Sequence, residues 1–207
     1  MLANVLAIVI GYLIGAIPSA YLFARFTTGK DIRQLGSGNV GALNTSRQLG
    51  SKAGIIVFLA DMCKGIAVVV AAKWGLAVSE PILLLAMLAA VIGHNWSVFL
   101  KFGGGRGMAT SLGALGVYLF FYGYWVALII FLVVLGIALL VTHKNYALSV
   151  IIAMITMPAS AAGLTDGPWQ FTLVSALMLV LVVIKVIPIA REAWARSKGM
   201  GDFIRGQ

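Results

Sequence analysis

The sequence predicts an all-α integral membrane protein with about seven transmembrane helices. Of its 207 residues, 61% are hydrophobic and only 10% are charged, whereas a soluble domain carries about 25% charged residues. The mean hydropathy is +1.04. Long uncharged runs recur along the chain, and a helix needs about 20 apolar residues to cross a bilayer. We expect one membrane-embedded domain over residues 1–207, ending in a basic cytoplasmic tail at 190–207.

The expected spans are separated by short segments that contain charged, polar or glycine residues. They lie near 2–24, 53–72, 81–100, 107–122, 123–142, 146–163 and 169–188. The uncharged run from 108 to 142 would be about 52 Å long as a single helix, which exceeds one crossing. Its aromatic sequence FYGYW, at 121–125, is typical of an interfacial turn and divides the run into two spans.

The basic residues predict which side of the membrane each loop faces. If loop 25–52 is cytoplasmic, the loops on that side and the tail hold twelve of the 15 Lys and Arg residues. By the positive-inside rule, the N-terminus then lies outside and the C-terminus inside. We expect a multi-pass protein of the cell inner (plasma) membrane whose active site faces the cytoplasm. The net charge of +9 belongs to these loops, because the chain lacks a polar basic domain for nucleic acid.

The first cytoplasmic loop, GSGNVGALNTSR, has the composition of a phosphate site. Its GSGNVG matches the dinucleotide fingerprint, but that fingerprint requires a βαβ unit, which a membrane span does not provide. Its glycines, which let backbone N–H groups turn inward and form an anion nest, are Gly36, Gly38 and Gly41. Its side-chain donors are Ser37, Asn39, Asn44 and Arg47, and ALNTSRQ could open a helix. The alternative is a flexible, solvated hairpin.

The second cytoplasmic loop, residues 93–113, combines glycines with cations. Its glycines include Gly104, Gly105 and Gly107, and its cations are Lys101 and Arg106. The Walker A spacing is absent, so we interpret the loop as a phosphate site of another kind. His94 could contact a ligand, act as an acid or base, or orient the loop, and we favour orientation. The alternative for the whole segment is a tight re-entrant turn with glycines for helix packing.

Two charged residues and one cysteine lie inside expected spans. Asp61 and Lys64 are three residues apart and share a helix face, so they can form an ion pair within the bilayer. We interpret the pair as structural, because no chain of acids continues across the membrane as a proton relay would require. Cys63, the single cysteine, cannot form an internal disulfide, and we expect it to be a small core residue.

The motifs that contain these residues resemble those of one enzyme family. The pattern G-S-G-N-x-G-x-x-N-x-x-R is matched at 36–47, and D-x-x-K-G is matched at 61–65. A third pattern, G-H-x-x-S-x-F-L-x-F-x-G-G-K/R-G-x-A-T, is matched at 93–110, which includes Ser97 and Thr110. The chain resembles the bacterial membrane acyltransferases that transfer a fatty acyl group from acyl phosphate to the 1-hydroxyl of glycerol 3-phosphate, giving lysophosphatidic acid and phosphate. That resemblance implies seven spans and the first step of phospholipid synthesis.

The sequence departs from the family pattern at several positions. Gly103 and Arg106 stand where lysines are usual, and Ala147 stands where the third cytoplasmic turn usually has a serine. The His-Arg-x-Asn cluster expected after the last span is absent. Either another residue substitutes, or the acceptor differs, or activity has been lost. The candidate substitutes are His143, Lys144, Asn145 and Ser149.

We expect catalysis without a metal or cofactor, because acyl phosphate is already activated. The expected catalytic residues are Ser37, Asn39, Asn44 and Arg47. The expected substrate and phosphate contacts are Gly36, Gly38, Gly41, His94, Ser97, Lys101, Gly104, Gly105, Arg106, Gly107, Thr110 and Lys144. Fixed donors would polarise the acyl carbonyl, and the leaving phosphate would take the hydroxyl proton. A covalent intermediate on Ser37 is disfavoured, because no base is placed to activate it.

The expected partners are the two substrates and membrane lipid, with no nucleic acid and no obligate protein partner. Two other functions remain open from the sequence. One is a related acyltransferase with another hydroxyl acceptor. The other is a small anion transporter, although the sequence shows no internal repeat and its polar residues gather on one side of the membrane.

Overall fold

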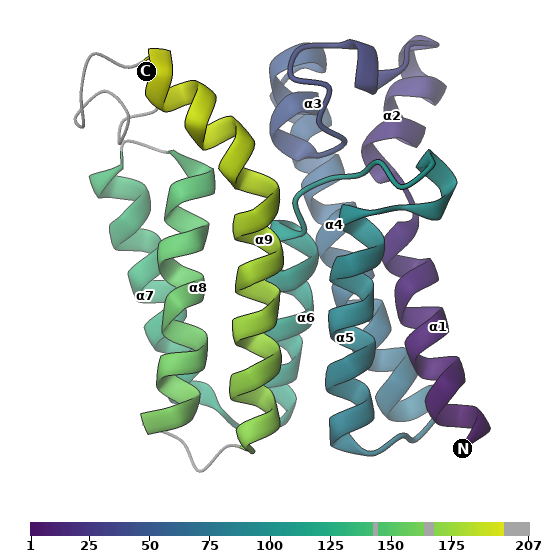
Figure 1. Ribbon diagram of the computed structural model, residues 1–207, viewed down its shortest axis with the longest axis vertical. Coiled ribbons are helices and arrows are strands. Elements are labelled where there is room, and N and C mark those ends of the chain that lie inside the picture. The colour runs from purple at the N-terminus through teal and green to yellow at the C-terminus, as the bar shows by residue number, and fades with distance from the viewer. Residues whose placement is uncertain (143–144, 164–167, 197–207) are drawn as a thin grey trace. The chain divides into compact units, whose positions relative to one another are not determined.

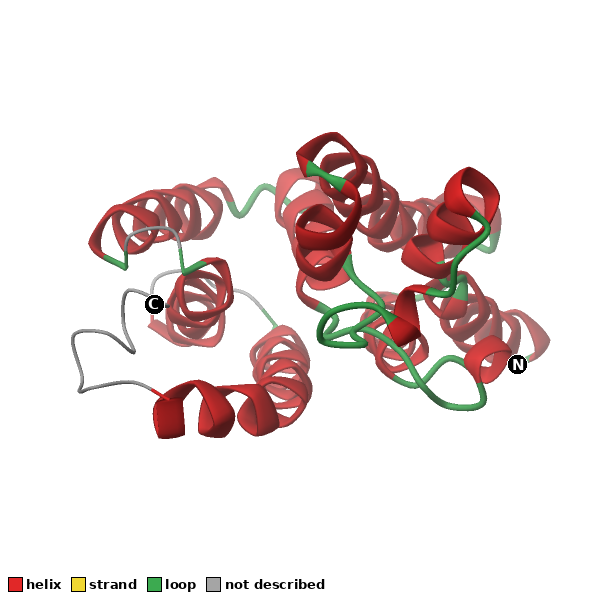
Figure 2. Ribbon diagram, turned by 90° about the horizontal axis from the view of Figure 1, so that it is seen from above, coloured by secondary structure: helices red, strands yellow, loops and turns green. Residues whose placement is uncertain are grey.

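The computed structural model describes residues 1–142, 145–163 and 168–196, and these residues are helices joined by short loops (Figures 1 and 2). The described residues form no β-strand, apart from one isolated antiparallel bridge between Ser97 and Gly103. The all-helical class predicted from the composition is therefore confirmed.

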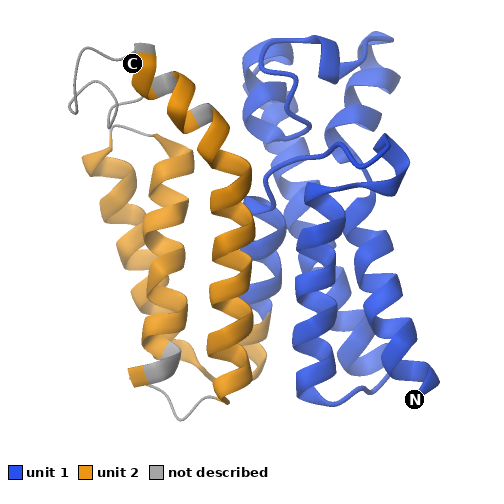
Figure 3. Cartoon of the chain, viewed as in Figure 1, with its two compact units in different colours: residues 1–117 blue, residues 118–207 orange. Residues whose placement is uncertain are grey.

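Internal contacts divide the chain into two compact units, residues 1–117 and 118–207 (Figure 3). We call them unit 1 and unit 2 and describe each by itself. The helix α6, Met108–Phe121, crosses the boundary between them. A single domain over 1–207 stays a prediction.

Unit 1 contains both glycine-rich loops. Its elements before α6 are α1 (Leu2–Ala16), α2 (Ser19–Thr28), the 3-10 helix η1 (Ile32–Gln34), α3 (Ala42–Leu49), α4 (Ser51–Val70), the π-helical turn η2 (Ala71–Gly75), α5 (Glu80–Asn95) and the 3-10 helix η3 (Val98–Leu100). Both glycine loops lie at the end of unit 1 that carries α2 and α3, opposite the N-terminus (Figure 1).

The first expected span is broken, which the sequence analysis did not anticipate. The helix ends at Ala16 and restarts at Ser19. Proline causes this break, because Pro18 has no N–H to donate and sterically disfavours helical geometry at the preceding Ile17. The carbonyl groups at the end of α1 consequently lose their helical donors and can accept hydrogen bonds from other elements.

Small residues allow the helices of unit 1 to pack backbone against backbone. A Cβ atom at Gly15 would lie 2.0 Å from the carbonyl oxygen of Ala90, across the contact between α1 and α5. A Cβ atom at Gly65 would lie 2.2 Å from the carbonyl oxygen of Thr110, where α4 meets α6. Close approach at small residues is the usual mode of helix association in membranes.

The apolar helices correspond in position to the seven expected spans. Three stretches are long and apolar enough to cross a membrane: Leu2–Thr28, Ser51–Gly75 and Trp169–Pro188. Four shorter apolar helices are Glu80–Asn95, Met108–Phe121, Trp125–Val141 and Tyr146–Ser160. The number of crossings and their orientation stay predictions.

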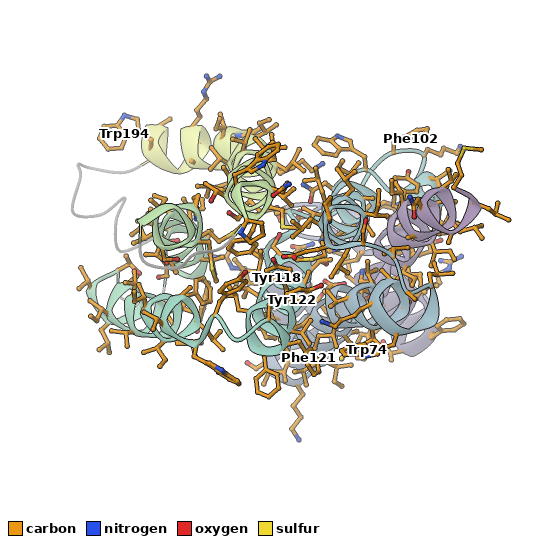
Figure 4. All side chains as sticks on the ribbon, turned by 90° about the horizontal axis from the view of Figure 1, so that it is seen from below. Trp74, Phe102, Tyr118, Phe121, Tyr122 and Trp194 are labelled. Carbon is orange, nitrogen blue, oxygen red and sulfur yellow. The ribbon has the colours of Figure 1, made fainter. Side chains whose placement is uncertain are left out.

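Unit 2 contains the end of α6 and the helices α7 (Trp125–Val141), α8 (Tyr146–Gly163) and α9 (Trp169–Arg196). The turn predicted at FYGYW is confirmed, because α6 ends at Phe121 and α7 begins at Trp125. Tyr118 stacks on Tyr122 with ring centroids 4.5 Å apart (Figure 4). The ring of Phe171, from the start of α9, also stacks on Tyr118, with ring centroids 4.9 Å apart.

Two expectations from the sequence were wrong in detail. The third span was expected to reach residue 100, but α5 ends at Asn95 because the following residues turn into the second glycine loop. The last helix continues beyond the expected span to Arg196, and the basic cytoplasmic tail at 190–207 stays a prediction. Cys63 is exposed rather than in the core, because the buried face of α4 is the one that carries Asp61 and Lys64.

Candidate active site

Asn44 holds the first glycine loop together from the inside. Its side-chain Oδ1 accepts a hydrogen bond from the backbone N–H of Ser37 at 3.1 Å. Its Nδ2 lies 3.0 Å from the carbonyl oxygens of both Leu35 and Asn39, to which it donates. With only 3% of its surface exposed, Asn44 shapes the loop, and its amide is occupied by loop backbone.

The glycines of this loop allow its tight turns, and they do not leave all of its backbone N–H groups available for an anion. Gly36 and Gly38 have φ angles of 56° and 69°, in the left-handed region that other residues rarely adopt. The N–H of Gly38 donates to the carbonyl of Leu35 at 3.0 Å. The N–H groups of Ser37 and Gly38 are thus bonded within the loop, and the expected nest is not formed by these two groups. The helix α3 does begin at Ala42, as expected, with Gly41 as its N-cap.

A cluster of apolar side chains brings the two glycine loops together. Val40 from the first loop and Leu100 from the second share a buried core with Ile32, Val57 and residues of α2. Because apolar contact removes these side chains from water or lipid headgroups, it fixes the spacing between loops that are far apart in sequence.

The second loop folds back on the end of α5. The N–H of Ser97 donates to the carbonyl of Gly103 at 2.8 Å, and the N–H of Gly105 donates to the carbonyl of His94 at 2.9 Å. Lys101 is exposed and has a left-handed φ of 54°. Only glycine can occupy position 105, since a Cβ atom there would lie 2.1 Å from Nε2 of His94.

Three ionisable side chains from two helices meet below this loop. Asp61 Oδ1 lies 2.7 Å from Lys64 Nζ, the pair that the spacing predicted, and both side chains are buried. Lys64 Nζ also lies 3.3 Å from Nδ1 of His94 and donates to the carbonyl oxygen of Ile17 at 2.7 Å. The free carbonyls at the proline break therefore bind Lys64 and, through Ala16 at 2.6 Å, the hydroxyl of Ser97.

A pocket in unit 1 lies where these features converge. Its lining includes the proline break, one residue of the first loop, two side chains of the buried ionisable cluster (Lys64 and His94) and residues of the second loop. The lining residues are Ala16, Ile17, Pro18, Ser19, Val40, Lys64, His94, Ser97, Leu100, Gly104 and Gly105. The contribution of residues 16–19 to the pocket lining was not predicted from the sequence, although Pro18 inside an apolar span was the signal that could have revealed it.

Arg106 supplies an unusual positive charge beside the loops. Its residue surface is only 8% exposed, and its Nε has no hydrogen-bond partner among the described residues. Burial, and then the like charge of Arg47, lower the pKa of Arg106 from its ordinary value. A buried guanidinium next to a second one is costly without an anion, so this arrangement favours the binding of a negatively charged ligand.

The remaining expected site residues fall into two groups. Gly36, Ser37 and Arg47 are exposed on the first loop and α3, and Asn39 is half-buried. Thr110 is fully buried, and its hydroxyl donates to the carbonyl of Asp61 at 3.1 Å, so it joins α6 to α4. Gly107 has a left-handed φ of 75° at the start of α6.

The turn that was predicted to be the third cytoplasmic one belongs to unit 2. Lys144 and His143 lie outside the described residues. Ser149 is buried, and its hydroxyl lies 2.8 Å from that of Thr142. Asn145 Oδ1 accepts from the N–H of Leu148 at 3.4 Å, which caps α8. Within the described ranges, no group of three or more His, Cys, Asp or Glu side chains is placed to hold a metal.

Comparison with known proteins agrees with this architecture. Residues 5–193 match the family model described as glycerol-3-phosphate acyltransferase. The chain is 40% identical over 182 residues to glycerol-3-phosphate acyltransferase 1 of Dehalococcoides mccartyi, which covers 88% of this chain and 86% of the relative. It is 37% identical over 188 residues to the glycerol-3-phosphate acyltransferase of Geobacter sulfurreducens, covering 90% of each chain.

Two solved structures share the fold. Both are crystal structures of PlsY (YgiH), described as an integral membrane glycerol 3-phosphate acyltransferase. The glycerol 3-phosphate form has a TM-score of 0.77 at 29% identity and covers 96% of each chain. The lysophosphatidic acid form has a TM-score of 0.75 at 30% identity and covers 99% of each chain. The fold is therefore that of a helical integral membrane protein of this type. The chain belongs to the glycerol-3-phosphate acyltransferase family.

Proposed function

We propose that the protein transfers a fatty acyl group from acyl phosphate to the 1-hydroxyl of glycerol 3-phosphate. The products are lysophosphatidic acid and inorganic phosphate, and the reaction is the first step of phospholipid synthesis. Family membership and the PlsY forms with glycerol 3-phosphate and with lysophosphatidic acid support the acceptor and the product. The acyl phosphate donor follows from the motif resemblance.

The observation that carries this proposal is the buried Arg106, whose pKa is lowered by burial and by the charge of Arg47 and which directly follows Gly105 in the lining of the pocket. Two guanidinium groups offer a phosphate several charge-assisted hydrogen bonds. Lys101, exposed on the second loop, would add positive charge nearby. Lys144, outside the described residues, stays a predicted phosphate contact. A site that holds phosphate groups rigidly can supply much of the rate enhancement by positioning alone.

The chemistry needs one bond to form and one to break. The glycerol hydroxyl oxygen attacks the acyl carbon, the bond from that carbon to the phosphate oxygen breaks, and the leaving phosphate takes the hydroxyl proton. Ser37 and Asn39 would donate to the acyl carbonyl oxygen as negative charge develops on it. Asn44, whose amide is bonded to loop backbone, would act by holding these donors in place. The acyl chain would stay between helices, in lipid.

The localisation and the partners of the enzyme are part of the same proposal. The enzyme would sit in the inner membrane with its loops in the cytoplasm, where it can take glycerol 3-phosphate from water and acyl phosphate from the membrane surface. It would work without a cofactor or an obligate protein partner. Ser97 and Thr110, whose hydroxyls bond to backbone carbonyls, would shape the pocket from beneath.

The test is a reaction with defined substrates in detergent. The purified protein is mixed with palmitoyl phosphate and glycerol 3-phosphate, and phosphate and lysophosphatidic acid are both measured. Coupled release of the two products, lost in Arg47→Ala, is expected. Arg25→Ala is the matched control, because Arg25 is exposed and its guanidinium donates to the carbonyl of Gly29, on its own helix end. Phosphate release without the lipid would indicate another acceptor or hydrolysis, and neither product would contradict the proposal.

A further inference from the structure

The ammonium group of Lys64 has a defined set of neighbours. Its Nζ lies 2.7 Å from Asp61 Oδ1 and 2.7 Å from the carbonyl oxygen of Ile17. His94 Nδ1, at 3.3 Å, is the third neighbour, and the carbonyl of Gly15 is a longer contact at 3.4 Å. An ammonium group has three N–H donors and no acceptor. Lys64 is therefore the donor in its hydrogen bonds to the two carbonyls and to His94, and its contact with Asp61 is an ion pair.

This geometry determines where the proton of His94 must be. Because Lys64 can only donate, Nδ1 of His94 must accept, and a neutral imidazole then carries its proton on Nε2. Asp61 does not offer Nδ1 an alternative acceptor, since its Oδ1 is 3.8 Å away, too far for a hydrogen bond. Asp61 and Lys64, both from α4, are ionisable groups close to this nitrogen.

The opposite edge of the imidazole ring faces the second glycine loop. Gly105 lies so close to Nε2 that a Cβ atom would overlap it. His94, Gly104 and Gly105 all line the pocket. The proton on Nε2 is therefore carried on the side of the ring that faces Gly105 and adjoins this pocket, whereas Lys64 occupies the other side.

We infer that Lys64 is a positioning residue that fixes His94 as an Nε2–H donor to an oxyanion bound in the pocket, and that His94 is consequently not the base for the glycerol hydroxyl. The inference rests on the proposed acyl transfer for its substrate. The ligand group is a phosphoryl oxygen, which either acyl phosphate or glycerol 3-phosphate could provide. A base needs an unprotonated nitrogen toward the substrate, and the unprotonated nitrogen of His94 points at Lys64.

The first test measures the tautomer directly and does not depend on activity. The chain has two histidines, His94 and His143, so the His94 signals in a protein labelled with 15N-histidine are assigned by their loss in His94→Gln. We expect a pyridine-type shift for Nδ1 and a pyrrole-type shift for Nε2. In Lys64→Met the preference should weaken or reverse. A pyrrole-type Nδ1 in the unmodified protein, or an unchanged tautomer in Lys64→Met, would overturn the inference.

The second test separates a donor from a base by two substitutions. His94→Gln can place an amide N–H near the position of Nε2 but cannot accept a proton, whereas His94→Asn can accept from Lys64 near the position of Nδ1 but lacks the distal donor. A donor role predicts that Gln stays within about tenfold of the unmodified rate, while Asn loses about 100-fold or more, the cost of one oxyanion donor. A base role predicts that both lose about 100-fold to 10,000-fold.

The kinetic constants show which substrate provides the oxygen. If the Nε2–H group of His94 binds glycerol 3-phosphate, His94→Asn raises the KM for glycerol 3-phosphate. If that N–H group binds acyl phosphate, the KM for acyl phosphate or kcat changes instead. Equal activity in the Gln and Asn variants, or a more active Asn variant, would contradict the donor role. Absence of acyl transfer in the unmodified protein would refute the proposed function. The tautomer measurement would still test, independently of activity, whether Lys64 fixes the proton of His94 on Nε2.

Discussion

Replacing Lys64 by methionine should be strongly destabilising, although the substitution removes a charge from an apolar helix. The side chains of Lys64 and Asp61 are only 7% and 3% exposed, so Lys64→Met leaves a buried carboxylate without its partner. Breaking a buried ion pair from one side costs about 3 to 5 kcal/mol. The lost hydrogen bond to the carbonyl of Ile17 adds about 1 kcal/mol.

The assay is thermal unfolding in detergent. For a chain of this length, 1 kcal/mol shifts Tm by about 2 to 4 °C, so the 3 to 5 kcal/mol term alone predicts a fall of about 6 to 20 °C. Lys52→Met, an exposed lysine on the same helix, is the matched control and should change Tm little.

The double variant Asp61→Leu with Lys64→Met tests the physical reasoning. It removes both charges, and an apolar pair in place of a buried ion pair is often tolerated. The double variant should therefore be more stable than Lys64→Met alone. Its main residual cost is the lost hydrogen bond from Lys64 to the carbonyl of Ile17, which still accepts from the N–H of Ser19 at 3.1 Å. A double variant whose loss equals the sum of the two single losses would show that the two side chains do not interact, and an unchanged Tm in Lys64→Met would refute the buried pair itself.

Three further outcomes are expected. Gly65→Ala should destabilise the protein by about 1 to 3 kcal/mol, because its Cβ would meet backbone atoms of α6. Gly116→Ala is the control: it has open space around it and should be neutral or stabilising by up to about 1 kcal/mol. Equal effects of the two substitutions on thermal unfolding would contradict the close packing at Gly65. Arg106→Leu should keep or raise Tm without ligand but abolish the Tm rise caused by inorganic phosphate, and a retained phosphate shift would remove Arg106 from the site. The hydrogen bond from Arg33 lowers the pKa of Asp31 from its ordinary value of 3.8, so the ionised carboxylate favours the folded loop. This stabilisation is present above about pH 4 and is lost as pH falls below that. The difference in Tm between the unmodified protein and Asp31→Asn should therefore shrink at low pH, and a constant difference would contradict the reasoning.

The departures from the family pattern fall in both units: Gly103 and Arg106 in unit 1, and Ala147 and the segment after the last span in unit 2. The pocket, both glycine loops and the Asp61–Lys64 pair belong to residues 1–117. In unit 2, Ser149 cannot easily replace the serine expected at Ala147, because its hydroxyl is buried against Thr142. Acceptor choice is therefore the property that the unit 2 substitutions would change first.

Much of the fold could be predicted from the sequence because its strongest signals are local. The uncharged runs placed the helices, since an uninterrupted apolar segment in lipid must satisfy its backbone hydrogen bonds as a helix. The Asp61–Lys64 pair followed from helical spacing alone. The helix at Ala42 followed from the loop residues before it, and the turn before Trp125 followed from its aromatic sequence.

Other features could not be predicted because they depend on partners far apart in the chain. The glycines of the first loop suggested an anion nest, but a side chain from α3 takes the N–H of Ser37. Thr110 matched a site motif, yet its hydroxyl is bonded to the backbone of α4. A side-chain donor has many possible acceptors in the folded chain, and sequence spacing does not say which one is near.

The sequence by itself determined that this is a helical membrane protein with two basic, glycine-rich loops suited to phosphate, because composition and motif spacing are properties of the chain alone. Only the tertiary structure decided how the site is built. Pro18 breaks the first helix and frees its carbonyls, Lys64 binds them together with Asp61, and the same ammonium group directs the proton of His94. The physical reason is that hydrogen-bond direction depends on distances between side chains from different helices, which packing sets.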